Sequence, residues 1–295
     1  VHLEAEAGVD DRRRAREDRG HGRLRESDGA ATRPRTRGGE GRRLGLVERG
    51  LLRFIEFERA LSASGPWGGE IRRPSDGEHP RKIAFIQCVG SREAPSQPPQ
   101  PCGRGAGGVE YCSSVCCMAA TKEAIIAKEH DPHVEPTIFY IDMRTFGKGF
   151  ERYYERAQDA YGVRYVRSAV SFVREDLRTR NVILRYVGSE KEESDSPIRE
   201  EEFDLVVLSV GLRPSEDACE LAERLGIALN EYGCAEAPPF RPGQTVQPDG
   251  SPVEGIFVAG AFGEPKDIPE TVVEASCAAA QVSALLAEAR GTLTT

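Results

Sequence analysis

The chain has 295 residues, 39% of them hydrophobic, which suits one large domain or two of ordinary size around a substantial core. Its formal net charge of −8 argues against nucleic acid as a partner, and no apolar run approaches the ~18 residues that a membrane span needs. The first residues lack the basic and apolar regions of a signal peptide, so we expect a cytoplasmic location without a membrane span.

Residues 1–49 differ in composition from the rest of the chain. They contain thirteen arginines, no lysine and no aromatic residue, and they have neither helical nor strand periodicity. Such a segment cannot bury enough apolar surface to offset its ordering entropy, so we expect it to be disordered. A mis-translated start is an equally good interpretation, and a basic arm for nucleic acid is a weaker one. We assign it no function.

The next segment leads into the first organised unit. A short amphipathic helix is expected at residues 51–61, and turns follow up to residue 80. The apolar run 82–87 predicts a buried strand that ends at Cys88. An exposed excursion rich in Pro, Gln and Gly follows, and a helix is expected from Cys112 to about Glu129.

Strands and helices then alternate. The expected elements are strands at 137–142, 163–167, 169–175, 182–187 and 204–211 and a helix at 149–161, with a charged loop at 188–202. A parallel α/β unit with an antiparallel excursion before its last apolar strand is typical of a dinucleotide-binding domain. Beyond it we expect a helix at 217–225, a strand at 255–260 and a long helix from Asp267. The predicted division is 1–49, a helix and linker at 50–80, a nucleotide-binding-like domain at 81–211, and 212–295.

Eight cysteines need a reason in a cytoplasmic chain, because disulfides rarely persist there. Five of the eight lie between Cys88 and Cys117, which indicates metal binding or redox chemistry. The turn after the first strand, where a glycine-rich loop would approach a pyrophosphate, contains Cys88-Val-Gly-Ser. Since no GxGxxG occurs, we do not expect NAD(P) binding.

Four thiolates around one point suit a [4Fe–4S] cluster. If the helix has already begun at Cys112, Cys112 and Cys116 share one of its faces, and Cys88 arrives from the neighbouring strand end. Three alternatives stay open on spacing alone: burial as small apolar residues, a structural zinc ion, and a dithiol relay, although no C-x-x-C occurs.

Several long segments resemble the flavin and iron–sulfur subunit of heterodisulfide reductase. These segments are Phe57–Pro66, Arg73–Gly77, Phe85–Arg92, Tyr111–Met118, Phe139–Arg144, Phe146–Gly149 and Pro265–Thr271. The likeness extends from about Leu51 to Leu286. It implies an α/β fold of the thioredoxin-reductase-like type, in which two dinucleotide-binding domains form a flavoprotein that binds FAD and carries iron–sulfur clusters.

The resemblance also implies roles for individual residues. Cys88, Cys112, Cys116 and Cys117 would ligate the [4Fe–4S] cluster nearest the flavin, and Lys122 would approach the flavin ring, unless it is a solvated helix lysine. Residues 255–271 resemble a second FAD-binding motif, unless they form only a helix-entry turn. The expected cofactor-binding residues there are Gly260, Ala261, Lys266, Asp267, Ile268, Pro269 and Thr271.

The chain departs from the family pattern in three ways. It lacks the glycine-rich FAD pyrophosphate motif, it lacks the ferredoxin-like cysteine runs, and its Cys88–Cys112 interval is about ten residues longer and contains Cys102. We interpret Cys102 as a bystander, with a ligand role as the alternative. The N-terminal half of the FAD domain is therefore expected to be missing, and a truncated chain of this kind could bind flavin weakly and be inactive alone.

The expected function is an electron-transfer oxidoreductase that passes electrons between FAD and a [4Fe–4S] cluster. In the family this serves disulfide reduction coupled to hydrogen, formate or reduced ferredoxin. The expected partners are the other subunits of such a complex and donors such as hydrogenase or ferredoxin, and a homodimer is left open. The alternatives are a zinc-stabilised or metal-free interaction module, and an NAD(P)H-dependent disulfide reductase.

Overall fold

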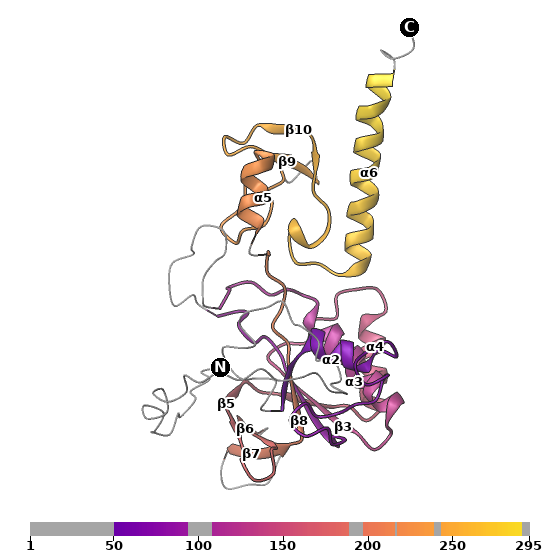
Figure 1. Cartoon of the computed structure of the whole chain (residues 1–295), viewed down its shortest axis with the longest axis vertical. Helices are drawn as coiled ribbons and strands as arrows, with labels where there is room; N and C mark the ends of the chain where they lie inside the picture. The colour runs from indigo at the N-terminus through magenta and orange to yellow at the C-terminus, as the bar shows by residue number, and fades with distance from the viewer. Residues whose placement is uncertain (1–49, 94–107, 189–196, 216, 239–242, 291–295) are drawn as a thin grey trace, which may run out of the picture.

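The structure is a computed structural model that describes residues 50–93, 108–188, 197–215, 217–238 and 243–290. The predictions for residues 1–49 and for Cys102 lie outside these ranges. The described chain forms an α/β body built on a parallel sheet, with a smaller group of C-terminal elements at one end (Figure 1).

A five-stranded sheet with only parallel pairings forms the centre of the body. Its order is β1 (Leu51–Arg53), β8 (Leu205–Leu208), β2 (Lys82–Ile86), β3 (Glu135–Tyr140) and β4 (Arg164–Arg167). Parallel neighbours need crossover connections, and helices α2 (Phe54–Leu61), α3 (Cys116–His130) and α4 (Phe150–Asp159) provide three of them. The predicted α/β class with a parallel sheet is confirmed.

Side-chain alternation along the strands assigns each face of the sheet to one core. Ile83 and Phe85 of β2 pack with the helices, together with Leu205 and Val207 of β8. The intervening residues pack against a three-stranded antiparallel sheet, which consists of β5 (Val170–Glu175), β6 (Val182–Val187) and β7 (Ile198–Phe203). The same alternation therefore determines which face of the sheet is reached by the side chains that directly follow β2 and β8.

Three predicted elements differ from the observed ones. Leu51–Arg53 forms strand β1 before helix α2 starts, because these residues extend the sheet beside β8. Helix α3 begins at Cys116 rather than Cys112, since Ser114 has a left-handed φ of 58°. Strand β7 falls in the segment predicted as a charged loop; its glutamates are tolerated because ion pairs such as Arg185–Glu200 (2.5 Å) hold them against β6.

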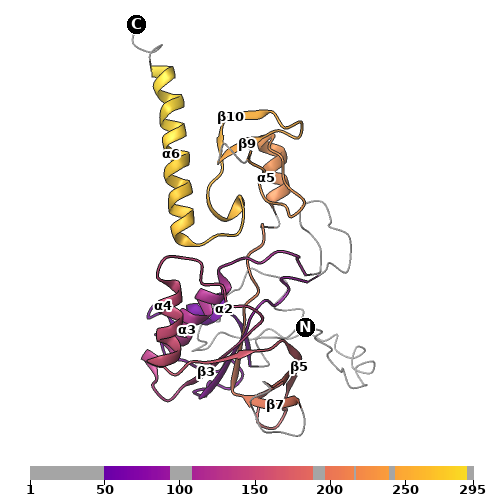
Figure 2. The same cartoon turned by 180° about the vertical axis from the view of Figure 1, so that it is seen from behind.

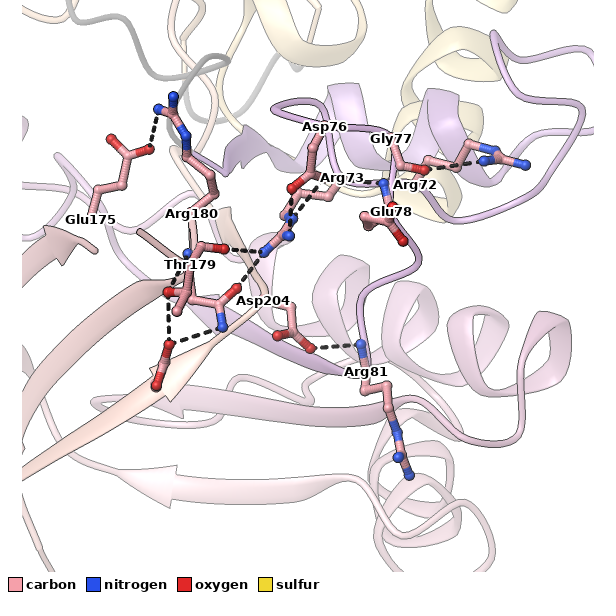
Figure 3. Close-up of polar contacts among 12 residues, drawn as sticks. Arg72, Arg73, Asp76, Gly77, Glu78, Arg81, Glu175, Thr179, Arg180 and Asp204 are labelled. Atoms are coloured by element: carbon pink, nitrogen blue, oxygen red, sulfur yellow. Dashed lines mark hydrogen bonds and ion pairs between the residues drawn. The ribbon is translucent and has the colours of Figure 1, made fainter. Parts of the chain in front are cut away.

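The turn at residues 72–78 is fixed to the antiparallel sheet by Arg73 (Figure 3). The Arg73 guanidinium donates to Asp76 Oδ1 at 2.9 Å, to the Thr179 carbonyl oxygen at 3.4 Å and to the Asn181 side chain. Asp204 accepts the backbone N–H groups of Arg81 and Lys82, both at 2.8 Å. These bonds determine where the chain enters strand β2.

The C-terminal elements are helix α5 (Ala218–Leu225), strands β9 (Gln244–Val246) and β10 (Pro252–Phe257), the short 3₁₀ helix η3 (Gly260–Phe262) and helix α6 (Ile268–Arg290). Figures 1 and 2 show them at one end of the molecule, with α6 standing beside the two-stranded sheet. Strand β9 was not expected from the sequence. No helix within the described ranges combines the length and apolar character that crossing a membrane would require.

Candidate functional site

The four cysteines predicted as ligands come from three segments that meet beyond the carboxyl ends of the parallel strands. Cys88 follows β2, Cys112 lies in the loop before α3, and Cys116 and Cys117 are the first residues of that helix. Burial raises the pKa of the Cys116 thiol to about 12, and the proximity of the other three sulfurs acts in the same direction. Burial and then Cys112 likewise raise the pKa of Cys88. The structure therefore brings all four thiols into one neighbourhood.

The thiols are not packed as tightly as the ligands of a single ion. Across the described residues, no three His, Cys, Asp or Glu side chains are arranged to hold one metal ion. A zinc ion needs its sulfurs at about 2.3 Å from one centre, whereas each cysteine of a cubane binds a different iron atom and the sulfurs are spread more widely.

The backbone around the thiols adopts an unusual conformation. Cys88 has a φ of 60° and Ser114 a φ of 58°, in the left-handed region that non-glycine residues rarely enter. Each such position costs about 1–2 kcal/mol. Because Cys112 precedes the helix, it does not share a helical face with Cys116, contrary to the arrangement expected if the helix had begun at Cys112. The turn at Ser114 brings it to the helix start instead.

Each of the four sulfurs interacts with an N–H group from another residue. The pairs are the Ser114 backbone N–H with Cys112 Sγ (3.4 Å), the Gly211 backbone N–H with Cys116, the Arg144 backbone N–H with Cys117, and the Arg92 side chain with Cys88. A hydrogen bond to sulfur favours the thiolate over the thiol, and in Cys88, Cys116 and Cys117 it acts against the rise in pKa that burial causes. These N–H groups favour negatively charged sulfurs, whereas the Cys117 thiol also donates to the Asp142 carbonyl oxygen at 3.6 Å.

Gly211 lies beside the thiols and was not predicted from the sequence. Its φ is +70°, and a Cβ atom there would lie 2.7 Å from Ser113 Oγ and 2.8 Å from Ser91 Oγ. Ser113 Oγ in turn accepts the Leu212 N–H at 2.8 Å. Only glycine allows the backbone N–H to approach Cys116 between the two hydroxyls. The available signal was the end of the last apolar strand at Ser-Val-Gly.

Several of the buried polar atoms without hydrogen-bond partners in the described chain lie in the segments around the thiols, while others, such as Ser75 Oγ and the Glu123 carboxylate, lie elsewhere. Those around the thiols are both amide atoms of Gln87, the hydroxyls of Ser91 and Ser209, Nη1 of Arg92 and Nε of Arg144. Most are donors, and buried donors normally have an acceptor. The thiolate and sulfide sulfurs of a [4Fe–4S] cluster are acceptors, so the donor set fits such a group.

Positive charge lies beside Cys88. Arg92 forms an ion pair with Asp142 at 2.8 Å, and this hydrogen bond lowers the pKa of the Asp142 carboxyl. Burial raises the pKa of the Cys88 thiol, and the charges of Arg92 and Arg144 offset part of that rise. A cluster ligated by four thiolates carries net negative charge, which these arginines would offset.

Lys122 lies on helix α3, six residues beyond Cys116. Its Nζ forms an ion pair with Glu58 Oε1 of helix α2 at 2.8 Å, and both side chains are partly exposed.

The next residue, Glu123, is completely buried, and neither carboxylate oxygen has a partner within the described ranges. Burial raises the pKa of Glu123 to about 9, so the carboxyl is neutral at pH 7. Glu123 was not predicted from the sequence, since nothing in its spacing distinguishes it from a surface glutamate.

The residues predicted to bind flavin gather at the start of helix α6. Gly260, with a φ of +78°, donates its N–H to Glu274 Oε2 at 2.9 Å, and a Cβ there would lie 3.2 Å from Thr271 Cγ2. Lys266 is buried and pairs with Glu274, and it lies 3.6 Å from Glu264. Glu274, which was not predicted from the sequence, therefore connects Gly260 with Lys266.

Asp267 forms a reciprocal cap for the same helix. Its Oδ1 accepts the Glu270 N–H at 2.8 Å, while its own N–H donates to Glu270 Oε2 at 3.1 Å. Thr271 Oγ1 donates to the Asp267 carbonyl oxygen at 2.7 Å. Ala261, Ile268 and Pro269 are exposed.

Fold and site together define an α/β protein with a parallel sheet of the dinucleotide-binding type, in which cysteines occupy the turn that would otherwise approach a nucleotide. No protein-family model matches the chain. Several curated proteins, however, match the chain over most of its length. The chain is 43% identical over 238 residues to the iron–sulfur A subunit of CoB–CoM heterodisulfide reductase from Methanocaldococcus jannaschii, covering 81% of this chain and 33% of the relative.

A second relative, the A subunit of the H₂/formate:CoB–CoM heterodisulfide, ferredoxin reductase from Methanococcus maripaludis, is 41% identical over 233 residues, 79% of this chain and 32% of the relative. Over that length the chain is a homologue of the heterodisulfide reductase A subunits, as its motifs indicate, and it spans about a third of the curated relatives it matches. Among solved structures, ornithine hydroxylase PvdA from Pseudomonas aeruginosa matches with a TM-score of 0.33 and 14% identity over 76% of this chain and 58% of that one, a likeness too low to support an argument.

Proposed function

We propose that the chain is an electron-transfer module in which Cys88, Cys112, Cys116 and Cys117 each bind one iron of a [4Fe–4S] cluster beside an FAD. The observation that carries the proposal is the meeting of four thiols from three segments, each thiol with its own N–H group. A flavin transfers electrons in pairs and the cluster singly, so together they convert one kind of transfer into the other.

The chain's own residues supply the environment for this cluster. Arg92 and Arg144 place positive charge beside it, and the N–H groups of Ser114, Gly211 and Arg144 point to ligand sulfurs. The amino end of helix α3 begins at two of the ligands, and its free N–H groups favour negative charge. The positive charges, the N–H groups and the helix start each stabilise negative charge, and they would favour thiolate and sulfide sulfurs at this partly buried site.

For the flavin we propose Lys122 as the group that faces the ring. A cation there would stabilise the anionic reduced form, and Glu58 holds the lysine at the helix surface through the 2.8 Å ion pair. The second part of the flavin site is the α6 start, with Gly260, Ala261, Asp267, Ile268, Pro269 and Thr271. Lys266 acts there through Glu274, which accepts the Gly260 N–H.

The names of the relatives support a proposal for the substrate class and the partners. The proposal is that the module serves a heterodisulfide reductase-like complex and receives electrons from a hydrogen-, formate- or ferredoxin-dependent donor, as the names of the relatives state for those proteins. A cytoplasmic location and a homodimer stay predictions.

Iron and sulfide analysis of the anaerobically reconstituted chain tests the proposal. Wild type is expected to be brown, with a broad absorbance near ~400 nm and about four iron and four sulfide ions per chain. Cys116→Ser should lose most of both, while Cys277→Ser, on helix α6 away from the site, should keep them. Equal iron in wild type and Cys116→Ser would contradict the ligand assignment.

The same preparation separates the alternatives. A colourless chain with one zinc ion would support a zinc-stabilised interaction module, and a colourless chain without metal would support a metal-free one. A spectral change on titration with NADPH would support the nicotinamide-dependent disulfide reductase. Each of these outcomes would replace the electron-transfer proposal.

A further inference from the structure

Two buried serine hydroxyls beside the thiols have no role in the site so far. Ser91 is 5% exposed and Ser209 is 1% exposed, and neither Oγ atom has a hydrogen-bond partner in the part of the chain that the structure describes. Leaving such a group unpaired in the interior costs about 1–3 kcal/mol. A native protein rarely keeps two of them in one place unless something else accepts their hydrogen bonds.

Ser91 lies between two of the proposed ligands. Its backbone N–H donates to the Cys88 carbonyl oxygen at 3.1 Å, which closes the turn after Cys88. Its Oγ lies 2.8 Å from where a Cβ on Gly211 would be, and the Gly211 N–H interacts with the Cys116 sulfur. The hydroxyl is therefore next to the backbone that contacts Cys116.

Ser209 approaches the same place from the neighbouring strand. Its N–H donates to the Ile86 carbonyl oxygen at 2.9 Å, and its carbonyl oxygen accepts the Val89 N–H at 3.1 Å, so it lies beside Cys88. In β8, Leu205 and Val207 face the helices, and alternation points the Ser209 side chain to the same face. Helix α3 begins at the carboxyl end of this sheet with Cys116 and Cys117.

We infer that the Ser91 and Ser209 hydroxyls donate hydrogen bonds to sulfur atoms of the cluster and raise its reduction potential. The inference rests on the proposed function and goes beyond it, since it assigns the tuning of the cluster to two residues that are not ligands. A hydroxyl donates and sulfur accepts. The reduced cluster carries more negative charge than the oxidised one, so these bonds stabilise the reduced form more.

The test compares reduction potentials of the full chain carrying its reconstituted cluster, titrated anaerobically and followed by electron paramagnetic resonance. Ser91→Ala and Ser209→Ala are expected to lower the midpoint potential. Ser75→Ala is the matched control, because Ser75 Oγ is also buried without a partner in the described residues. Ser75 belongs to the turn that leads to the start of β2, whereas Cys88 follows the other end of that strand, so its loss should leave the potential unchanged.

A Thr/Val pair separates the hydroxyl from the packing. Ser91→Thr keeps the donor and Ser91→Val removes it at nearly the same shape, so threonine should have the higher potential of the two. One proton coupling to the cluster that disappears in deuterated water should be present in wild type and Ser91→Thr and absent in Ser91→Val, while those of the N–H groups and of Ser209 stay.

Two results would overturn the inference. If wild type and both alanine variants hold four iron ions and titrate at the same potential, the hydroxyls do not bond to the cluster and the proposed function survives. If wild type holds no iron, the proposed function fails and the inference fails with it.

Discussion

The cysteine site and the start of helix α6 are both predicted by family motifs to hold a cofactor, but they are built differently. Around the thiols, Ser91, Ser209 and Gln87 keep buried polar atoms that nothing within the described ranges satisfies. At the α6 start, Lys266 pairs with Glu274, Glu274 accepts the Gly260 N–H, and Asp267 caps the helix.

This contrast gives a physical way to interpret a motif. A motif identifies residues that belong to one site. If the buried polar atoms of these residues lack partners within the chain, a ligand can accept their hydrogen bonds; if the residues already bond to one another, fewer groups remain for a ligand. The cysteine site has unused donors and suits a group made of acceptors. The α6 start is internally bonded, so a ligand there would use its exposed edge, where Ala261, Ile268 and Pro269 lie.

The largest expected effect is that of Gly211→Ala on the cysteine site. The new Cβ would lie under 3 Å from the hydroxyls of Ser113 and Ser91, at a φ of +70°, and the N–H that approaches Cys116 would be displaced. We expect most of the iron to be lost on reconstitution, as measured by iron and sulfide analysis.

Gly226→Ala is the matched control for that variant. Gly226 has a similar φ of +66°, but within the described part of the chain a Cβ there would meet nothing within 4 Å. It carries the backbone cost of about 1–2 kcal/mol without the collision. If both variants lost iron equally, backbone strain alone would explain the result, and the close approach at Gly211 would not matter.

Glu123→Gln tests whether an unpartnered group always indicates a ligand. Burial raises the pKa of Glu123 from 4.5 to about 9, so between these values the folded chain holds a proton that the unfolded chain has released. The contribution of Glu123 to the free energy of unfolding is therefore fully present below pH 4.5. As the pH rises toward 9, this contribution falls by about 1.4 kcal/mol per pH unit.

Glutamine cannot ionise, so the variant's advantage over wild type should grow by roughly 3 kcal/mol between pH 5 and pH 7. Urea denaturation at pH 5, 7 and 9 measures it. The exposed Glu155→Gln, on helix α4, should show no such trend. A constant difference across pH would mean that the Glu123 carboxyl is charged in the folded chain.

Lys266→Met should break the bonded arrangement at the α6 start. The Lys266 side chain is 4% exposed and that of Glu274 is 30% exposed, so the variant leaves a partly buried carboxylate without its cation. We expect the free energy of unfolding to fall by about 2–3 kcal/mol. Iron content should not change, because the thiols belong to another region. Loss of iron would show that the two regions depend on each other.

The smallest expected effect is that of Arg73→Ala, in the turn shown in Figure 3. The variant removes the bonds to Asp76, Thr179 and Asn181, and we expect a loss of about 1–2 kcal/mol in urea denaturation with normal iron content. Arg72→Ala removes a partly exposed pair with Glu70 and one bond to the Gly77 carbonyl oxygen at 3.1 Å, both within the same turn, and should cost less, about 0.5–1 kcal/mol. Equal losses would mean that the link to the antiparallel sheet contributes nothing.

The parallel sheet could be predicted from the sequence because its strands are short apolar runs separated by helical patterns. The runs at 82–86 and 205–208 are buried on both faces, which leaves an uninterrupted apolar signal. Strand β7 could not be predicted from the sequence, since four of its six residues are charged and its stability comes from cross-strand ion pairs with β6. Strand β1 is only three residues long, and its pairing with β8 is a tertiary contact.

The cysteines of the site could be predicted from their residue type, but the atoms that surround them could not. Gly211 is 94 residues beyond Cys117 in the chain, and nothing local connects its N–H to a thiol. Ser91 resembles an ordinary loop serine and Ser209 an ordinary residue at a strand end until the fold buries both beside the thiols. The left-handed Ser114 also escaped prediction, because the helical pattern from Cys112 onward continues through it.

Helix α3 carries both ends of the proposed electron path. Cys116 and Lys122 are six residues apart on it, about 9 Å along the axis at 1.5 Å per residue. A helix is a stiff spacer, so the hydrogen-bonded geometry of α3 would help to fix the gap between a cluster at its start and a flavin beside Lys122. Transfer across a fixed gap should proceed at the same rate in viscous and in dilute solvent, however slowly the rest of a complex moves.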